Sequence, residues 1–308
     1  MAEPLTFKAT MEFEYGVPRT MSPGVVRLVA NNPSPYTFKG TNTYLIGTKS
    51  LAVIDPGPLD PPHCAAILRA AAGRPITHIL VTHTHRDHVD GLQDLLAATG
   101  AKTAGYGPYA LTSQVAAKTG PGGEGSHTQR DWQPDIVLRA GGSVAGEDWA
   151  VEAIHTPGHT PDHLSFALKP TDPATRVLFP GDHVMAWNTS VVSPPAGRMG
   201  DYLSSLETLM ARDDTVAFPG HGGQYEQPAR VAKAYLIHRR MRDAAILDSI
   251  KGGASRVEQV VAKIYKGLDE RLIPAACLSV LAHVEHQLER GLVRASMPLS
   301  QASDLTAV

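Results

Sequence analysis

The segment VTHTHRDHVDG, residues 81–91, places three histidines and one aspartate within six positions. These ligand-type residues are His83, His85, Asp87 and His88. The preceding run ITHIL is rich in apolar and β-branched residues, which is typical of a buried strand. We therefore expect the four side chains just beyond the end of a strand, in the loop that leads to a helix beginning near Gly91. Open α/β proteins commonly place their chemistry at such a position.

The same design recurs later in the chain. In three later segments a predicted strand is followed by a histidine or an aspartate: WAVEAIHTPGHT, RVLFPGD and TVAFPGH. These segments add His159, Asp182 and His221 to the candidates. Neutral imidazole and carboxylate are zinc ligands, and a catalytic zinc keeps one position open for water or substrate. Seven ligands are too many for one tetrahedral ion but suit two ions that share a carboxylate. The sequence therefore predicts two zinc ions, although these ligand types are also compatible with iron or manganese.

Local patterns predict the elements around these segments. TNTYLIG (41–47) and LAVIDPG (51–57) form an expected hairpin, followed by a helix over 63–72. A further amphipathic helix is expected over 200–212, and GPGGEG (120–125) is expected to be a surface loop. After residue 226 the pattern becomes helical, with helices expected over 229–250, 256–266 and 274–290, then a short strand LVRAS and frayed residues from Leu299. We therefore divide the chain into domains at 1–226 and 227–308.

Composition excludes several classes of protein. The net charge of -2 over 308 residues gives no global electrostatic signal for nucleic acid or a membrane surface. The two cysteines, Cys64 and Cys277, form no Cys-x-x-Cys motif, so neither a disulfide framework nor a zinc-thiolate site is expected. No stretch is apolar enough to span a bilayer, and the first thirty residues contain no export signal. These features favour a cytoplasmic protein without a membrane partner.

Five motifs, taken in order, resemble the metallo-β-lactamase superfamily over residues 51–222. They are Asp55 in VIDPG, the segment THTHRDH, His159 in TPGHT, Asp182 in PGD and His221 in PGHG. The resemblance implies an αββα sandwich with the metals at one edge. It also implies that His83, His85 and His159 hold one zinc, that Asp87, His88 and His221 hold the other, and that Asp182 bridges them. Asp55 would bind no metal but would orient the ligands through hydrogen bonds.

Within the superfamily, THTHRDHVDG, HTPGHTPDH, PGHGG and YLIHRRMRD are similar to the branch named for β-lactamase-like protein 2. The animal member of that branch is a mitochondrial single-strand endoribonuclease, and the branch carries a small winged-helix-like domain after the last metal motif. Residues 227–308 are therefore expected to form such a domain. This domain could act as a lid over the site, as the interface of a homo-oligomer, or as a nucleic-acid-binding surface.

The metal motif leaves more than one function open. The favoured one is hydrolysis of a small ester, thioester or lactone, in which a hydroxide shared by the two zinc ions attacks the carbonyl. The alternative is a single-strand endoribonuclease with the same site, whose phosphate-binding groove would use basic residues of KAYLIHRRMRD: Lys233, Arg239, Arg240 and Arg242. The low aromatic content of 6% and the net charge favour a small-molecule substrate over single-stranded RNA. A mononuclear iron persulfide dioxygenase is a third, less favoured function.

Further residues receive expected roles. Asp87 and His88 are expected to convert a simple zinc site into a hydrolytic one, which makes Asp87 a catalytic candidate. His163 would donate a hydrogen bond to the oxyanion or leaving group, or alternatively would play a structural part. Trp187, Asn188 and Tyr225 are expected to line the substrate pocket. The histidines without such context are expected to be structural, namely His63, His78, His127, His155, His238, His283 and His286.

Overall fold

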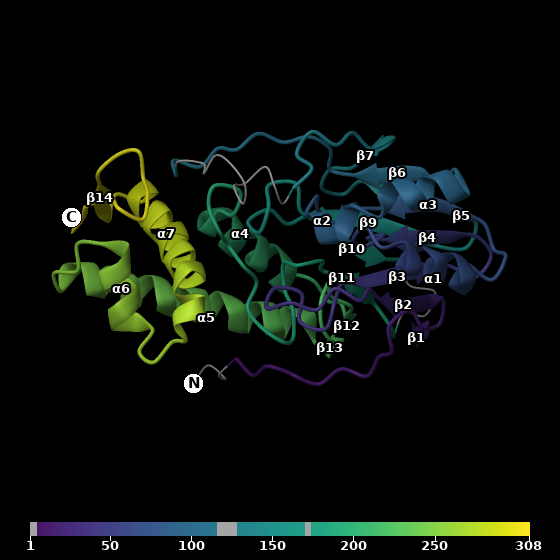
Figure 1. The fold of residues 1–308 in the computed structure, drawn as a ribbon, viewed down its shortest axis with the longest axis horizontal. Coiled ribbons are helices and arrows are strands. Elements are labelled where there is room, and N and C mark those ends of the chain that lie inside the picture. Colours follow the sequence, from purple (N-terminus) through teal and green to yellow (C-terminus); the bar gives the residue numbers. More distant parts are fainter. Residues whose placement is uncertain (1–4, 116–127, 170–173) are drawn as a thin grey trace.

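The computed structural model describes residues 5–115, 128–169 and 174–308. Two sheets pack face to face, helices cover both outer faces, and further helices form a smaller unit at the C-terminal end (Figure 1). The αββα sandwich is therefore confirmed. The expected loop at 120–125 and His127 lie outside the described residues.

In the part of the chain that the structure describes, the first sheet has seven strands, arranged in sequence order. They are β1 (Arg19–Ser22), β2 (Val25–Val29), β3 (Asn42–Ile46), β4 (Leu51–Ile54), β5 (Ile76–Leu80), β6 (Lys102–Gly105) and β7 (Ile136–Val137). Strands β1 to β4 are antiparallel neighbours, which confirms the hairpin of β3 and β4. Strands β4 to β7 run parallel, and helices α1 (Pro61–Ala71) and α3 (Leu92–Thr99) connect successive parallel strands.

The second sheet has six strands in the described residues. They are β8 (Ser143–Ala145), β9 (Ala150–His155), β10 (Leu164–Leu168), β11 (Val177–Phe179), β12 (Val216–Ala217) and β13 (Tyr225–Glu226). All neighbours are antiparallel except β11 and β12, which are parallel and joined through α4 (Met199–Met210). Strands β9, β11 and β12 consequently point in one direction. Their carboxyl ends bring the segments of His159, Asp182 and His221 to one edge.

Strand β4 shows why the apolar runs become strands inside a layered fold. Its alternate side chains point to opposite faces, so Ala52 and Ile54 pack between the two sheets while Leu51 and Val53 pack under α1 and α3. Both faces are covered, which explains why the strand is continuously apolar. A third core lies between the second sheet and α4, where Leu206 is fully buried.

The C-terminal unit is built mainly from three helices. It contains α5 (Pro228–Lys251), α6 (Val257–Ile264), α7 (Ile273–Glu289), a 3-10 turn η2 (Glu270–Leu272), and the strands β14 (Val293–Ala295) and β15 (Leu305–Ala307). The first half of α5 packs against α4 through Tyr235 and Leu236, whereas its second half enters the C-terminal core through Ile246 and Ile250. The division that we propose at residue 226 falls between β13 and α5, after which helices predominate, but α5 belongs to both cores. None of the described helices is both long and apolar enough to cross a membrane.

Two expectations about local structure need correction. Asp87 and His88 lie on a short helix of their own, α2 (Arg86–Val89), rather than in an irregular loop before α3. The residues after Leu299 are not frayed, because β15 pairs with β14 and buries Leu305 in the C-terminal core. The expected short strand LVRAS corresponds to β14, whereas β15 was not predicted because it is stabilised by pairing with a strand about ten residues earlier in the chain.

Candidate metal centre

Asp55 organises the metal motif from the end of β4. Its backbone is left-handed, with φ of 53°, and its carboxylate accepts hydrogen bonds from the Thr82 backbone N–H at 2.8 Å and from the Thr82 hydroxyl at 2.7 Å. The same carboxylate accepts a hydrogen bond from His88 Nδ1 at 2.8 Å. One buried side chain therefore ties the end of β5 to α2. This geometry fits the expected orienting role of Asp55.

The first ligand triad consists of His83, His85 and His159. His85 Nδ1 lies 2.9 Å from His83 Nε2 and 3.0 Å from His159 Nε2. All three ligand atoms lie within 4.8 Å of one another. The loop after β5 and the loop after β9 therefore present three imidazoles to one point.

The second ligand triad consists of Asp87, His88 and His221. His221 Nε2 lies 3.3 Å from His88 Nε2 and 3.2 Å from Asp87 Oδ2. Asp182 lies between the triads, because its Oδ2 is 3.7 Å from His159 Nε2 and 3.3 Å from His221 Nε2. The structure thus brings all seven predicted ligands together, with Asp182 in the position of a bridge.

Hydrogen bonds fix which ring nitrogen each histidine presents. The Nδ1 atom of His159 faces the Val191 carbonyl at 2.6 Å, and that of His221 faces the Gly40 carbonyl at 3.2 Å. A carbonyl can only accept, so each Nδ1 carries a proton and Nε2 is the ring nitrogen that faces the cluster. Nε2 is therefore the atom with which each of these two histidines would bind a metal ion.

The donor set fits a pair of zinc ions. With Zn–N bonds of about 2.0–2.1 Å, two ligands of a tetrahedral ion stand roughly 3.3 Å apart, close to the spacings above. Asp182 Oδ1 is buried without a hydrogen-bond donor, which leaves it available to a cation. Gly220 keeps the space open, since a Cβ there would lie 2.4 Å from Asp182 Oδ1 and 2.8 Å from His88 Cε1.

The electrostatic surroundings of the two triads differ. Burial and the neighbouring His159 imidazole lower the pKa of His85 to about 3, so that this ring stays neutral. Burial also acts to lower the pKa of His221, but the Asp182 and Asp87 carboxylates outweigh it and raise this pKa to about 9. The second triad therefore attracts positive charge, and a bound metal ion would displace a proton there.

His163 does not fit the role of a hydrogen-bond donor to substrate. The ring is fully buried, its Nδ1 pairs with the Thr156 hydroxyl at 2.9 Å, and its Nε2 accepts the Asp182 backbone N–H at 3.1 Å. An acceptor nitrogen has no proton to offer, and the other nitrogen is already engaged. The structural alternative for His163 is therefore the better one, and its observed contact supports the backbone of Asp182.

The three expected pocket residues lie in different environments. Trp187 stacks on Phe38 with ring centroids 4.9 Å apart, and Asn188 is exposed in the same segment after Asp182. Tyr225 is instead buried in the core under α4 and α5, where its hydroxyl donates to the Val184 carbonyl at 3.1 Å. It therefore does not line a substrate pocket, because strand β13 turns its ring inward.

The arginines of α5 that the sequence offered to a phosphate-binding groove make contacts within the protein. Arg239 is only 4% exposed and donates to the Ser190 carbonyl. Arg240 pairs with Glu207 at 2.7 Å, and the Arg242 guanidinium stacks 4.3 Å from the centroid of the Tyr265 ring. Arg239 is therefore not available to line a phosphate-binding groove, as the endoribonuclease alternative would require.

The structure adds supporting residues that the motif pattern did not reveal. Asp162 accepts hydrogen bonds from the Thr84 N–H at 2.9 Å and its hydroxyl at 2.8 Å, which fixes the turn between His83 and His85. Its only sequence signal is a carboxylate in TPDH, close to the His159 motif. None of the other described histidines expected to be structural belongs to a ligand group; they are His63, His78, His155, His238, His283 and His286.

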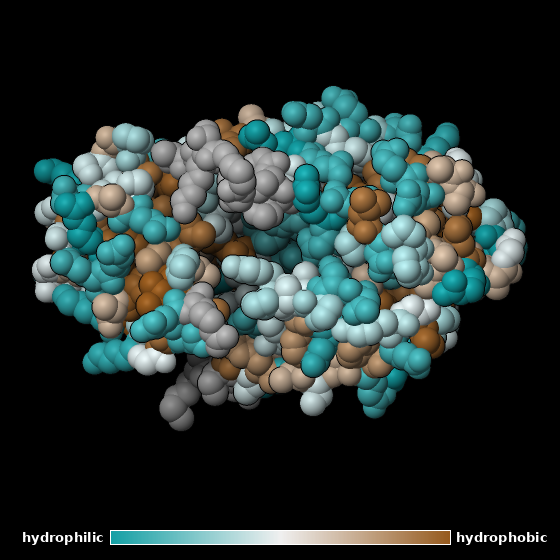
Figure 2. Space-filling model, viewed as in Figure 1, coloured by the Kyte–Doolittle hydropathy of each residue, from teal (hydrophilic) through white to brown (hydrophobic). Residues whose placement is uncertain are grey.

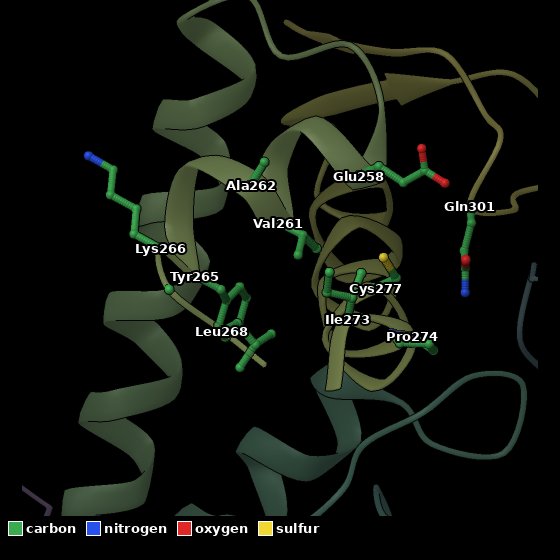
Figure 3. Close-up of a pocket in the computed structure, with 11 residues that line it drawn as sticks. Glu258, Val261, Ala262, Tyr265, Lys266, Leu268, Ile273, Pro274, Cys277 and Gln301 are labelled. Atoms are coloured by element: carbon green, nitrogen blue, oxygen red, sulfur yellow. The ribbon is translucent and has the colours of Figure 1, made fainter. Parts of the chain in front are cut away.

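The surface near the site has an apolar side. Figure 2 shows a hollow beside α2 that is lined by hydrophilic residues, with hydrophobic residues gathered on the side of the C-terminal helices. A separate pocket of about 580 Å³ lies between α6 and α7 (Figure 3). Its walls include Val261, Leu268, Ile273 and Cys277, and no proposed metal ligand lines it.

An αββα sandwich with this ligand cluster at its edge defines a class of metalloenzymes. Residues 36–221 match the model of the metallo-beta-lactamase superfamily, and the chain belongs to this superfamily of metal-dependent hydrolases. Residues 257–298 match the beta-lactamase associated winged helix domain, which confirms the expected type of the C-terminal domain.

Individual relatives agree with this assignment. The chain is 30% identical over 291 residues to a beta-lactamase-like protein 2 homolog of Drosophila melanogaster, covering 90% of this chain and 91% of the relative. It is also 30% identical over 239 residues to the lactamase-like protein adaB of Aspergillus niger, covering 76% and 66%.

Solved structures share the fold over nearly the whole length. A beta-lactamase domain protein from Burkholderia ambifaria has a TM-score of 0.74 at 18% identity, and the match covers 99% of this chain and 97% of that one. A metallo-beta-lactamase family protein from Thermus thermophilus has a TM-score of 0.70 at 20% identity, covering 94% and 100%.

Proposed function

We propose that this protein is a zinc-dependent hydrolase with a dinuclear site, and that its substrate is a small ester, thioester or lactone. One observation carries the proposal: two complete ligand triads converge with the Asp182 carboxylate between them. Two ions held there would lower the pKa of a shared water and polarise the scissile carbonyl oxygen.

The protein's own residues would hold and orient this centre. Asp87 supplies a carboxylate oxygen to the second triad, and the Thr41 hydroxyl donates to that carboxylate at 3.2 Å. Phe38 and Trp187 form an aromatic pair next to the same triad, because Gly222, adjacent to His221, packs against the Trp187 ring. An apolar group of the substrate could pack there while its carbonyl faces the ligands.

The charge pattern favours the small substrate over single-stranded RNA. A phosphate-binding groove needs basic side chains that are free to meet a backbone. In α5, Arg239 is buried and Arg240 is paired with Glu207. Two of the four basic residues that the sequence offered to such a groove are therefore buried or ion-paired, which disfavours the endoribonuclease alternative, and that alternative remains an outcome of the experiment below.

The test is a substrate screen on the zinc-reconstituted protein. Esters, thioesters, lactones, a phosphodiester and single-stranded RNA are compared for the parent and for Asp87→Ala. We expect turnover of a carbonyl substrate that falls by about 100-fold or more in Asp87→Ala, because the second triad loses its carboxylate while the three-histidine triad stays intact.

Two results would redirect the proposal. Cleavage of RNA at low enzyme concentration, with an affinity that falls by roughly 0.7 log units per neutralised phosphate for each log unit of salt, would establish the nuclease instead. One iron per chain in the protein as purified, together with no hydrolysis of any substrate, would favour the mononuclear dioxygenase.

A further inference from the structure

Arg239 is a buried cation whose surroundings contain carbonyl groups and aromatic rings. It lies on α5, and its guanidinium carbon is 5.4 Å from the centroid of the Tyr202 ring. Within the described part of the chain, no ion pair joins it to a carboxylate. A buried charge is costly unless polar groups compensate it. The contacts of Arg239 therefore indicate what it is placed to do.

Its hydrogen bond leads to the segment between Asp182 and α4. Arg239 Nη2 donates to the carbonyl of Ser190, while the Ser190 hydroxyl donates to the carbonyl of Asp182. The next carbonyl along the chain, that of Val191, receives the Nδ1 proton of His159. One guanidinium thus holds the peptide directly before the one whose carbonyl orients a proposed zinc ligand.

A second residue of α5 acts on the same segment from one turn earlier. The hydroxyl of Tyr235 lies within hydrogen-bond distance of the carbonyls of Met185 and Asn188. Positions four apart on a helix share a face, so Tyr235 and Arg239 both hydrogen-bond to carbonyls of this segment. Tyr235 holds its beginning, whereas only Arg239 reaches the residue next to Val191.

We propose that Arg239 is a positioning residue through which helix α5 sets the geometry of His159 and hence the metal affinity of the three-histidine triad. The inference rests on the proposed metal centre. The chain of contacts runs from the guanidinium to the Ser190 carbonyl and from the adjacent Val191 carbonyl to His159 Nδ1. The second triad uses other anchors, since His88 is held by Asp55 and His221 by Gly40.

The test separates the two triads by mutation. In a His221→Ala background the three-histidine triad remains intact, and in a His159→Ala background the second triad remains. Zinc dissociation constants are measured by competition with a chromophoric chelator in both backgrounds, with and without Arg239→Gln. We expect Arg239→Gln to weaken zinc binding by about 10–100-fold in the His221→Ala background and by less than about threefold in the His159→Ala background.

Two further variants control for a general loss of folded structure. Arg240→Gln changes the neighbouring, exposed arginine and should leave both dissociation constants unchanged. Arg239→Lys keeps the charge and one donor, so it should recover part of the lost affinity and remain testable if Arg239→Gln folds poorly. Circular dichroism and the melting temperature of each metal-free variant report folding separately.

The outcomes distinguish this inference from the metal centre itself. Equal weakening in both backgrounds, or no weakening in either, would overturn the role of Arg239 while leaving the dinuclear centre in place. A parent protein that binds no zinc would overturn the proposed centre and this inference with it.

Discussion

Gly220 is a residue at which the backbone comes close to the proposed ligands. A methyl group there would lie 2.4 Å from Asp182 Oδ1, which is closer than real Cβ contacts allow. We expect Gly220→Ala to displace the bridging carboxylate and to lower both zinc content and turnover by about tenfold or more. The matched control is Gly223→Ala, where the nearest atom would be 3.5 Å away. Equal zinc content in the two variants would contradict the close approach.

Asp162 gives a residue-level prediction for pH. Burial raises the pKa of this carboxyl to about 6, although hydrogen bonds from Thr160 and Thr84 oppose the shift. The folded-state pKa lies above the unfolded value, so the contribution of Asp162 to stability is greatest at low pH and is lost as pH rises through about 6. Between pH 5 and pH 7.5, the metal-free parent should lose roughly 1–2 kcal/mol of unfolding free energy relative to Asp162→Asn.

Urea unfolding of both metal-free proteins at the two pH values measures this difference. An unchanged difference would show that Asp162 stays ionised across the range.

Single residues also show what the sequence could and could not predict. The clustering of the seven candidate ligands could be predicted because each follows a strand, and strand ends meet at one edge of the sandwich. The role of His163 could not, since it depends on a hydrogen bond from the Asp182 backbone, which only the folded loop brings near. The burial of Arg239 was equally hidden, because it depends on a distant loop and not on helical spacing.

Among the secondary-structure elements, strand β15 makes the clearest prediction. Leu305 is 3% exposed and pairs with Ala295 of β14 in the C-terminal core. Leu305→Ala should lower the free energy of unfolding by about 2–4 kcal/mol, because it removes buried apolar surface and leaves a cavity. Thr306→Ala, at the exposed neighbouring position, should change it by less than about 0.5 kcal/mol. Similar effects of the two substitutions in urea unfolding would mean that β15 does not close this core.

Elements with strong periodicity agree well with the sequence prediction. The helices expected over 229–250 and 274–290 differ from α5 and α7 by only one residue at each end. Short elements were missed for a physical reason. The four residues of α2 are too few to show a helical period, and β15 is stabilised by its partner strand rather than by its own composition.

At the scale of the whole molecule, the fold and the ligand cluster could be predicted, whereas the relation between the domains could not. The C-terminal helices are not a separate appendage, because α5 contributes to the core beneath the second sheet and contacts the segment after Asp182. The sequence shows where strands give way to helices. It does not show that the first of those helices supports the metal edge.

The charge on the surface of the whole molecule leads to a prediction about substrate class. Arg240 is exposed and paired with Glu207. None of its described contacts involves a proposed metal ligand. Arg240→Glu should therefore change ester or thioester turnover by less than about twofold, because a surface ion pair contributes little. Steady-state kinetics at two salt concentrations provide the measurement. A large loss of activity that depends on salt would indicate that the substrate is a polyanion.

The number of metal ions that the reconstituted chain binds tests the central claim most directly. Metal-free protein is titrated with zinc and the bound metal is counted per chain for the parent, Asp182→Ala and His221→Ala. The dinuclear centre predicts two ions in the parent, loss of occupancy at both sites in Asp182→Ala, and one remaining ion in His221→Ala. A parent that binds only one ion after full reconstitution, or an Asp182→Ala variant with the zinc content of the parent, would contradict it.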